Sequence, residues 1–170
     1  FFQVASIIST TGFATADYVL WPQLSRLVLV LLMFCGACAG STGGGIKCSR
    51  VLMLLRAIRR EIHQIAHPRS VEVVKLDGKV AEESTVHSVL VFVGCYGLIL
   101  LGAALVVSLD KMPFDVSFSA ALTCLSNVGP GLAAIGPTGN FSGFSDLSKL
   151  ALSLCMIVGR LEIFPILVMF

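Results

Sequence analysis

The feature that most constrains this chain is an apolar run without Asp, Glu, Lys or Arg from Val86 to Leu109. At 1.5 Å per helical residue, its roughly 24 residues suffice to cross a hydrocarbon core about 30 Å thick. A second run of that length, Leu147–Phe170, contains Arg160 and Glu162. Hydrophobic residues make up 56% of the sequence and charged residues 13%, about half the charged fraction of soluble domains. We therefore predict an all-α integral membrane protein.

Two other apolar runs are too short to cross a bilayer. Phe1–Ser9 ends in Thr10-Thr11-Gly12-Phe13, and Phe114–Leu125 ends in Ser126-Asn127-Val128-Gly129-Pro130-Gly131. Non-helical backbone is tolerated at membrane depth only where it is buried in protein or lines a water-filled cavity. Each short helix with its glycine-containing loop is therefore predicted to be a re-entrant pore loop. The alternative is an ordinary turn in a membrane bundle.

Basic residues predict the orientation in the membrane. Eight of the twelve lysines and arginines fall between Lys47 and Lys79. Because positive charge concentrates on the cytoplasmic side, this segment should be cytoplasmic, with Leu24–Ala39 running inward and Val86–Leu109 running outward. The segment should contain a short interfacial helix and then a hairpin at Asp77-Gly78. It serves either as a topology anchor or as a docking surface for a cytosolic partner.

The chain contains an internal repeat. A shift of 117 residues aligns Ser9 with Ser126 and Gly12 with Gly129. A shift of 123 residues aligns the segment 24–27 with 147–150, and Gly36 with Gly159. Two alignments in one order, separated by a difference in loop length, predict two copies of a pore loop followed by an inner helix.

The two loops have the composition of a cation filter. A cation that leaves water must exchange its hydration shell for oxygens, which rings of backbone carbonyls provide. Glycine permits the backbone conformation that turns carbonyls toward an axis, and the negative end of each short helix points at the ion path. The predicted filter residues are Thr10, Thr11, Gly12, Phe13, Asn127, Val128, Gly129 and Pro130.

The two inner helices differ at one depth. After Gly36 the first breaks into the glycine-rich stretch Gly40–Gly45, whereas after Gly159 the second carries Arg160. An arginine near mid-membrane costs about 2.5–3.5 kcal/mol and needs acceptors, which the carbonyls of a broken helix supply. We therefore expect Arg160 to contact the glycine-rich stretch. The alternative is that it pairs with Glu162 or an absent helix and only braces the bundle.

We expect no enzymatic activity. The stretch Gly40–Gly45 resembles a phosphate-binding loop, but Ile46 separates its last glycine from Lys47, and the stretch follows a membrane helix rather than a strand. The three histidines lack the spacing of metal ligands.

These motifs together resemble the Trk/Ktr/HKT superfamily of cation transporters, most closely its bacterial TrkH-type potassium-uptake subunits. The matching pieces are residues 9–13, 40–45, 126–131 and 159–162. They occur in the family's order and extend over nearly the whole chain, so the resemblance is specific.

The resemblance implies a fold of four outer helix–pore loop–inner helix units around one pore. Residues 1–66 would form the third pore loop and its broken inner helix, residues 67–85 a cytoplasmic connector, and residues 86–170 the complete fourth unit. The first two units are then missing, and both ends of the chain look cut. Two pore loops cannot close a fourfold filter, so this chain alone is not expected to conduct.

The resemblance also implies potassium uptake across the bacterial inner membrane by a multi-pass subunit. Potassium would bind at Thr10, Thr11, Gly12, Asn127, Val128 and Gly129. The pore would be obstructed below the filter by Gly40, Ser41, Thr42, Gly43, Gly44 and Gly45, which Arg160 contacts. The implied partners are membrane lipid, a second copy of the full subunit and a TrkA-like cytosolic nucleotide-binding ring, without nucleic acid. No cofactor is expected on this chain, because potassium is the transported ligand.

Other functions remain open at this point. A sodium-permeable or ion-coupled secondary transporter of the same superfamily also explains a broken membrane helix. A non-conducting structural membrane subunit would need neither filter glycines nor a mid-membrane arginine.

Overall fold

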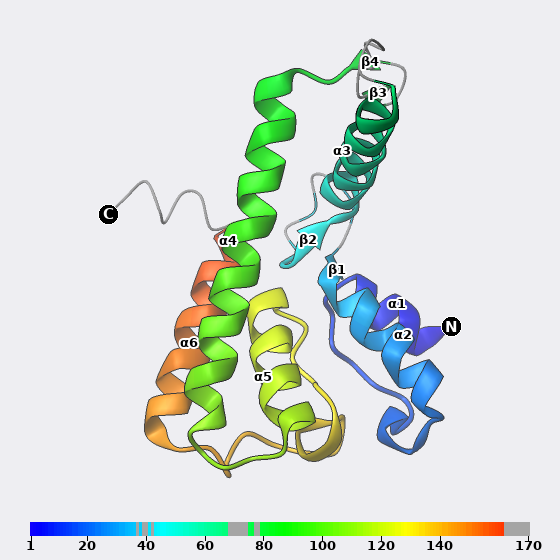
Figure 1. The fold of residues 1–170 in the computed structure, drawn as a ribbon. Coiled ribbons are helices and arrows are strands. Elements are labelled where there is room, and N and C mark those ends of the chain that lie inside the picture. The colour runs from blue at the N-terminus through cyan, green and yellow to red at the C-terminus, as the bar shows by residue number, and fades with distance from the viewer. Residues whose placement is uncertain (37, 39–40, 42, 68–74, 77–78, 162–170) are drawn as a thin grey trace.

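The computed structural model describes residues 1–36, 38, 41, 43–67, 75–76 and 79–161, and the chain is mostly helical (Figure 1). Its elements, in chain order, are α1 (Phe2–Ile8), η1 (Tyr18–Leu20), α2 (Gln23–Phe34), β1 (Cys35–Gly36), β2 (Ile46–Lys47), α3 (Cys48–Ala66), β3 (Lys75–Leu76), β4 (Lys79–Val80), α4 (Glu83–Ser108), α5 (Phe114–Ser126), η2 (Ala133–Ile135) and α6 (Asp146–Arg160).

Helix α4 is the longest described element, and α3, α5 and α6 contact it. Among the described helices it is the one whose length, 26 residues, and composition suffice to cross a membrane. One face is buried at helical spacing by Val86, Val89, Phe92, Tyr96, Leu100, Ala103 and Val107. Leucines at positions 98, 101 and 105 remain exposed on the other side, as a lipid-facing surface requires. Figure 1 shows α5 and α6 against one half of α4 and α3 near the other half.

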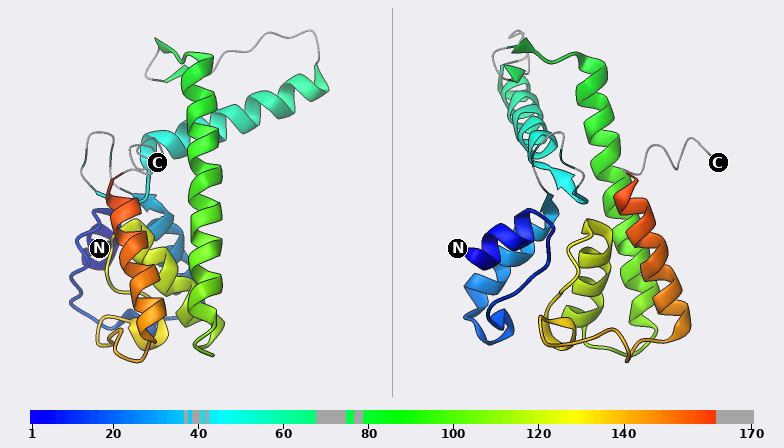
Figure 2. Two further views of the ribbon diagram at one scale, coloured as in Figure 1. Left: turned by 90° about the vertical axis from the view of Figure 1, so that its left-hand side faces the viewer. Right: turned by 180° about the vertical axis from the view of Figure 1, so that it is seen from behind.

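Helix α5 is short and buried. It has 13 residues, about 20 Å of helix, which is less than the thickness of a hydrocarbon core. Ala120, Ala121, Leu122, Cys124 and Leu125 are fully buried. Helix α5 contacts α2, α4 and α6, and in the rear view of Figure 2 it lies between the α1–α2 pair and the α4–α6 pair. Helix α5 is thus enclosed by protein, and its re-entrant geometry stays a prediction.

The first inner helix ends earlier than the sequence predicted. The apolar run continues to Ala39, but α2 ends at Phe34, and Cys35 is extended. Cys35 then pairs with Ile46 and Gly36 with Lys47 in a parallel two-residue ladder. The nine residues 37–45 that connect the two strands therefore begin and end at adjacent positions. Gly36 therefore lies in a strand, unlike Gly159 in α6. The helix stops here because Cys35 and Gly36 pair with Ile46 and Lys47. This pairing brings Gly36 so close to Gly44 that a Cβ on Gly36 would clash with the Gly44 carbonyl.

The second inner helix is described as α6, from Asp146 to Arg160. The remainder of the predicted span, to Phe170, lies outside the described residues. Ser145 caps α6 by accepting a hydrogen bond from the Ser148 N–H. The start of α6 corresponds to the start of α2 under the 123-residue shift, as the sequence alignment predicted.

Between these units, α3 leaves the bundle at a steep angle to α4 (Figure 2, left). Arg60 binds Glu83 at 2.5 Å, and the Arg50 guanidinium lies 4.1 Å from the centre of the Phe92 ring. The hydrogen bond from Arg60 to Glu83 raises the arginine's pKa. Both contacts fix one face of α3 on α4.

Strands β3 and β4 pair antiparallel, Lys75 with Val80 and Leu76 with Lys79. This pairing confirms the predicted hairpin, whose turn residues Asp77 and Gly78 lie outside the described residues. The chain is therefore not purely α-helical, because two short ladders accompany the helices.

Candidate ion-conducting site

The first predicted filter loop begins where α1 ends. Thr10 has φ +55° and Gly12 has φ +78°. The N–H of Thr10 donates to the Ile7 carbonyl at 3.0 Å, and that of Thr11 donates to the Ser6 carbonyl at 2.9 Å. The Ser6 hydroxyl in turn donates to the Phe13 carbonyl at 2.6 Å. Residues of α1 thus hydrogen-bond both ends of the loop: Thr10 and Thr11 at its start and Phe13 at its end.

The second predicted filter loop has the same pattern 117 residues further on. Asn127 has φ +56° and Gly129 has φ +107°. The Asn127 N–H donates to Cys124 at 3.2 Å, and the Val128 N–H donates to Thr123 at 3.0 Å. The Thr123 hydroxyl donates to the Pro130 carbonyl at 3.1 Å. The correspondence seen in the sequence therefore extends to backbone conformation and hydrogen bonding.

Both loops leave a matched set of carbonyl oxygens unused. Within the described part of the chain, six carbonyls accept no hydrogen bond: those of Thr10, Thr11, Gly12, Asn127, Val128 and Gly129. The next carbonyl in each loop, of Phe13 or Pro130, is bonded to the preceding helix. Buried backbone carbonyls are seldom left without a partner, but of these six residues only Val128 is buried, and Thr11 and Gly129 are exposed, so their oxygens are accessible from outside the chain. The six residues are those predicted to bind potassium, and ion binding there remains a prediction.

The two loops approach each other closely. A Cβ on Gly12 would clash with the Val128 carbonyl oxygen and lie 3.1 Å from Pro130 Cδ. Gly12, Phe13, Gly129 and Pro130 also line one cavity of about 450 Å³. The structure thus brings four of the eight predicted filter residues, two from each loop, to a common space.

Side chains distant in sequence support the second loop. The Asn127 amide donates to the Met156 carbonyl at 3.2 Å, which ties the loop to α6. Tyr96 of α4 bonds Ser126 at 2.7 Å, and Tyr18 donates to the Gly131 carbonyl at 3.0 Å. The sequence analysis missed both tyrosines. The sequence did contain an indication of their role. A tyrosine within or beside an apolar run is expected to be buried, and its hydroxyl then needs a hydrogen-bond partner.

The glycine-rich stretch meets the second loop. A Cβ on Gly44 would lie 2.5 Å from the Ser126 carbonyl oxygen and 3.0 Å from Asn127 Cβ. The Gly43 N–H donates to the Ser41 hydroxyl at 3.2 Å, and Gly45 has φ +79°. Of the predicted gate residues, Gly40 and Thr42 lie outside the described residues. Gly44 therefore packs against the end of α5, where the second loop begins.

Arg160 is the last residue of α6 and is exposed. It lines a cavity of about 510 Å³ with Asn127, Met156, Ile157 and Leu161. Within the described part of the chain it makes no hydrogen bond or ion pair, and its alternative partner Glu162 lies outside that part. The structure brings Arg160 to the cavity beside Asn127. Its contact with the glycine-rich stretch stays a prediction.

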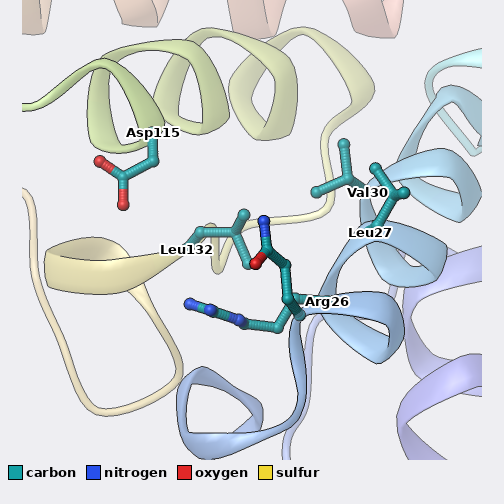
Figure 3. Close-up of a pocket in the computed structure, with 6 residues that line it drawn as sticks. Arg26, Leu27, Val30, Asp115 and Leu132 are labelled. Carbon is teal, nitrogen blue, oxygen red and sulfur yellow. The ribbon is translucent and has the colours of Figure 1, made fainter.

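A third cavity, of about 300 Å³, lies between α2, α5 and the end of the second loop. Figure 3 shows Arg26 extending from α2 and Asp115 from α5 toward the space beside Leu132. Arg26 Nε is buried and has no hydrogen-bond partner among the described residues. Arg26 is aligned with Lys149 in the repeat, which instead lies 3.8 Å from Asp146 on the exposed start of α6.

Three other aspartates make local contacts. Asp17 accepts from the Val19 N–H at 2.9 Å and caps η1. Asp110 accepts from the Ser145 N–H at 3.0 Å, and the hydrogen bonds of Ser145 hold the pKa of this carboxyl below its usual value. Asp146 is paired with Lys149.

This geometry has counterparts in known proteins. The TrkH family model, described as cation transport protein, matches residues 1–170. The chain is 36% identical over its whole length to the Trk system potassium uptake protein TrkG of Escherichia coli K12, of which it covers 35%. Over 99% of its length it is 36% identical to the Trk system potassium uptake protein TrkH of Vibrio parahaemolyticus, of which it covers 34%.

The fold is also similar to a solved structure. The crystal structure of the potassium transporter TrkH from Vibrio parahaemolyticus matches with a TM-score of 0.89 and 36% identity, covering 99% of this chain and 36% of that one. The chain thus spans about a third of the length of its relatives. The family model covers every residue, and sequence and fold agree with it, so the chain belongs to the TrkH family of cation transport proteins.

Proposed function

We propose that this chain supplies two of the pore loops of a potassium-uptake subunit in the plasma membrane. Its relatives are potassium uptake proteins, and the resemblance implies four such loops around one pore. The observation that carries the proposal is the matched pair of loops with six unbonded carbonyls. Oxygens of this kind replace the hydration shell of a cation in a filter.

Ion flux into liposomes that contain the full-length protein tests this function. We expect rubidium to enter at a rate close to that of potassium and sodium to enter more slowly, because the filter replaces the water shell of the larger ions. Equal entry of sodium and potassium would contradict a potassium filter, and no entry of either would contradict a pore.

The glycine-rich stretch and Arg160 form the proposed gate below the filter. Gly44 packs against Ser126, and Arg160 lines the cavity beside Asn127, so both lie at the inner end of the second loop. A positive charge and a loop at this place would oppose the passage of potassium. The full subunit is proposed to act as a homodimer and to be opened by a cytosolic nucleotide-binding ring.

An ion-coupled secondary transporter is the second candidate, because α2 breaks at Phe34 and the chain continues as a non-helical excursion. Broken helices of this kind build midplane binding sites in such transporters. Uptake that saturates with potassium and follows a proton or sodium gradient would favour this candidate over a pore.

A thiol at Lys79 tests the proposed orientation. After removal of the six native cysteines, Lys79→Cys should react with a membrane-impermeant reagent in inside-out vesicles and remain unmodified in intact cells. The reason is that Lys79 belongs to the basic segment expected in the cytoplasm. Asp146→Cys, at the start of α6, is the matched control and should show the opposite pattern. Labelling of position 79 from outside would overturn the orientation of both pore loops.

A further inference from the structure

The chain contains two tyrosines, and both hydroxyls bind the second filter loop. Tyr18 belongs to η1 in the outer segment, and Tyr96 belongs to α4. The two side chains are almost completely buried, with 1% and 2% of their surface exposed. They reach the loop from different elements, and each contacts a different end of it.

Tyr96 holds the start of the loop. Its hydroxyl lies 2.7 Å from the hydroxyl of Ser126, which is fully buried and is the last residue of α5. The rings of Phe92 and Phe34 pack around the Tyr96 ring, with centres 6.5 and 6.4 Å away. Because the ring is enclosed, its hydroxyl has a defined position, and so does the residue from which the loop departs.

Tyr18 holds the finish of the loop. Its hydroxyl donates to the Gly131 carbonyl at 3.0 Å across 113 residues of sequence. The Asp17 cap on Val19 and the edge-on ring of Trp21 fix η1 around it. Burial, and secondarily the Asp17 carboxylate, raises the pKa of Tyr18 to about 12, so the hydroxyl keeps its proton at neutral pH.

Of the four carbonyls between these two anchors, that of Pro130 accepts from Thr123, and the other three are unbonded among the described residues. Asn127, Val128 and Gly129 lie between Ser126 and Gly131 and accept no hydrogen bond within the described part of the chain. Ion selectivity in a carbonyl filter depends on the number and placement of its oxygens. A loop fixed at both ends can hold these oxygens in place without bonding them.

We infer that Tyr96 and Tyr18 are positioning residues that clamp the second filter loop at both ends and thereby maintain its selectivity for potassium. This inference rests on the proposed function of the loop as a filter. Among the described residues, the side chains that bond the first loop and the segment after it come from α1: Ser6 donates to the Phe13 carbonyl, and Gln3 donates to the Ala16 carbonyl at 2.7 Å.

The test compares Tyr96→Phe and Tyr18→Phe in the full-length protein in liposomes. Each substitution removes one hydroxyl and keeps the ring. Each should lower the ratio of potassium to sodium uptake about threefold to tenfold, the range that corresponds to one hydrogen bond. This ratio does not depend on how much protein folds, so a purely structural role would leave it unchanged. Ser88→Ala is the matched control, because its hydroxyl on α4 bonds only its own helix, at the Ser84 carbonyl.

A double variant separates positioning from stability. In Tyr96→Phe, the buried Ser126 hydroxyl loses its partner, whereas Tyr96→Phe with Ser126→Ala leaves no unpaired group. We expect the double variant to recover the amount of folded protein and to keep the lowered ratio, equal to that of Tyr96→Phe alone. Recovery of the ratio together with the fold would overturn the positioning role.

The outcome also distinguishes the clamp from the filter. Gly12→Ala lies in the other loop and tests the filter without touching either tyrosine. A lowered ratio in Gly12→Ala with normal ratios in either tyrosine variant overturns the two-ended clamp and leaves the filter standing. Normal ratios in all three variants overturn the filter as well.

Discussion

Replacing Gly12 with alanine should lower the ratio of potassium to sodium uptake at least about tenfold. Gly12 has φ +78°, where a side chain adds about 1–3 kcal/mol of strain, and a factor of ten corresponds to about 1.4 kcal/mol. The added Cβ would also clash with the Val128 carbonyl oxygen of the other loop. One methyl group therefore disturbs carbonyls of both loops. Uptake of rubidium and sodium into liposomes that contain the full-length protein measures the ratio.

Two further glycines provide the comparison. Gly97 lies in α4, and a Cβ there meets nothing within 4 Å, so Gly97→Ala should leave the ratio unchanged. Gly129 has φ +107°, but a Cβ there also meets open space. Gly129→Ser should therefore lower the ratio through strain alone and by less than Gly12→Ala. An unchanged ratio in both filter variants would remove the assignment of the two loops as a filter.

Removal of the gate should raise potassium flux about tenfold when the cytosolic partner is absent. Arg160→Ala takes a positive charge from the cavity that it shares with Asn127. At an effective dielectric constant of about 20, two unit charges about 10 Å apart repel by roughly 1.7 kcal/mol. This exceeds the 1.4 kcal/mol of a tenfold change. Deletion of Gly43–Gly45 should have the same effect, because it removes the contact of Gly44 with Ser126.

Flux must be normalised to folded protein, because Arg160 could instead brace the bundle. A bracing role predicts less folded protein and an unchanged flux per folded molecule. Lys149→Ala is the matched control: it removes a positive charge from the other end of α6, where Lys149 is 44% exposed and its ion pair with Asp146 contributes little. If normalised flux rises in neither Arg160→Ala nor the deletion, the glycine-rich stretch is not the gate.

The sequence was sufficient to predict the elements that rest on local chemistry. Helix α5 begins at Phe114, as predicted, and ends at Ser126, because Asn127 adopts the left-handed conformation there. The hairpin of β3 and β4 followed from Asp77-Gly78. Matching positions in the two loops followed from the repeat, because a glycine at a fixed offset after a short helix reflects a shared backbone conformation.

The sequence was insufficient where partners distant in the chain decide the structure. The break after Phe34 depends on pairing with Ile46 and Lys47, and two-residue strands leave no periodicity to detect. The hydroxyl of Tyr18 finds its acceptor 113 residues away, so spacing gave no indication of it. The same limit applies to Arg160, whose side chain has no hydrogen-bond or ion-pair partner among the described residues.

The parallel pairing of β1 with β2 has a consequence for how such transporters diversify. It fixes both ends of residues 37–45 to adjacent positions, so the direction in which α3 continues does not depend on what lies between them. Doubling the length of a flexible closed loop costs only about 0.6 kcal/mol. Changes of length between Gly36 and Gly44 can therefore accumulate during evolution without redirecting α2 or α3. A side chain at Gly44 is different, because its Cβ would lie 2.5 Å from the Ser126 carbonyl oxygen at the end of α5.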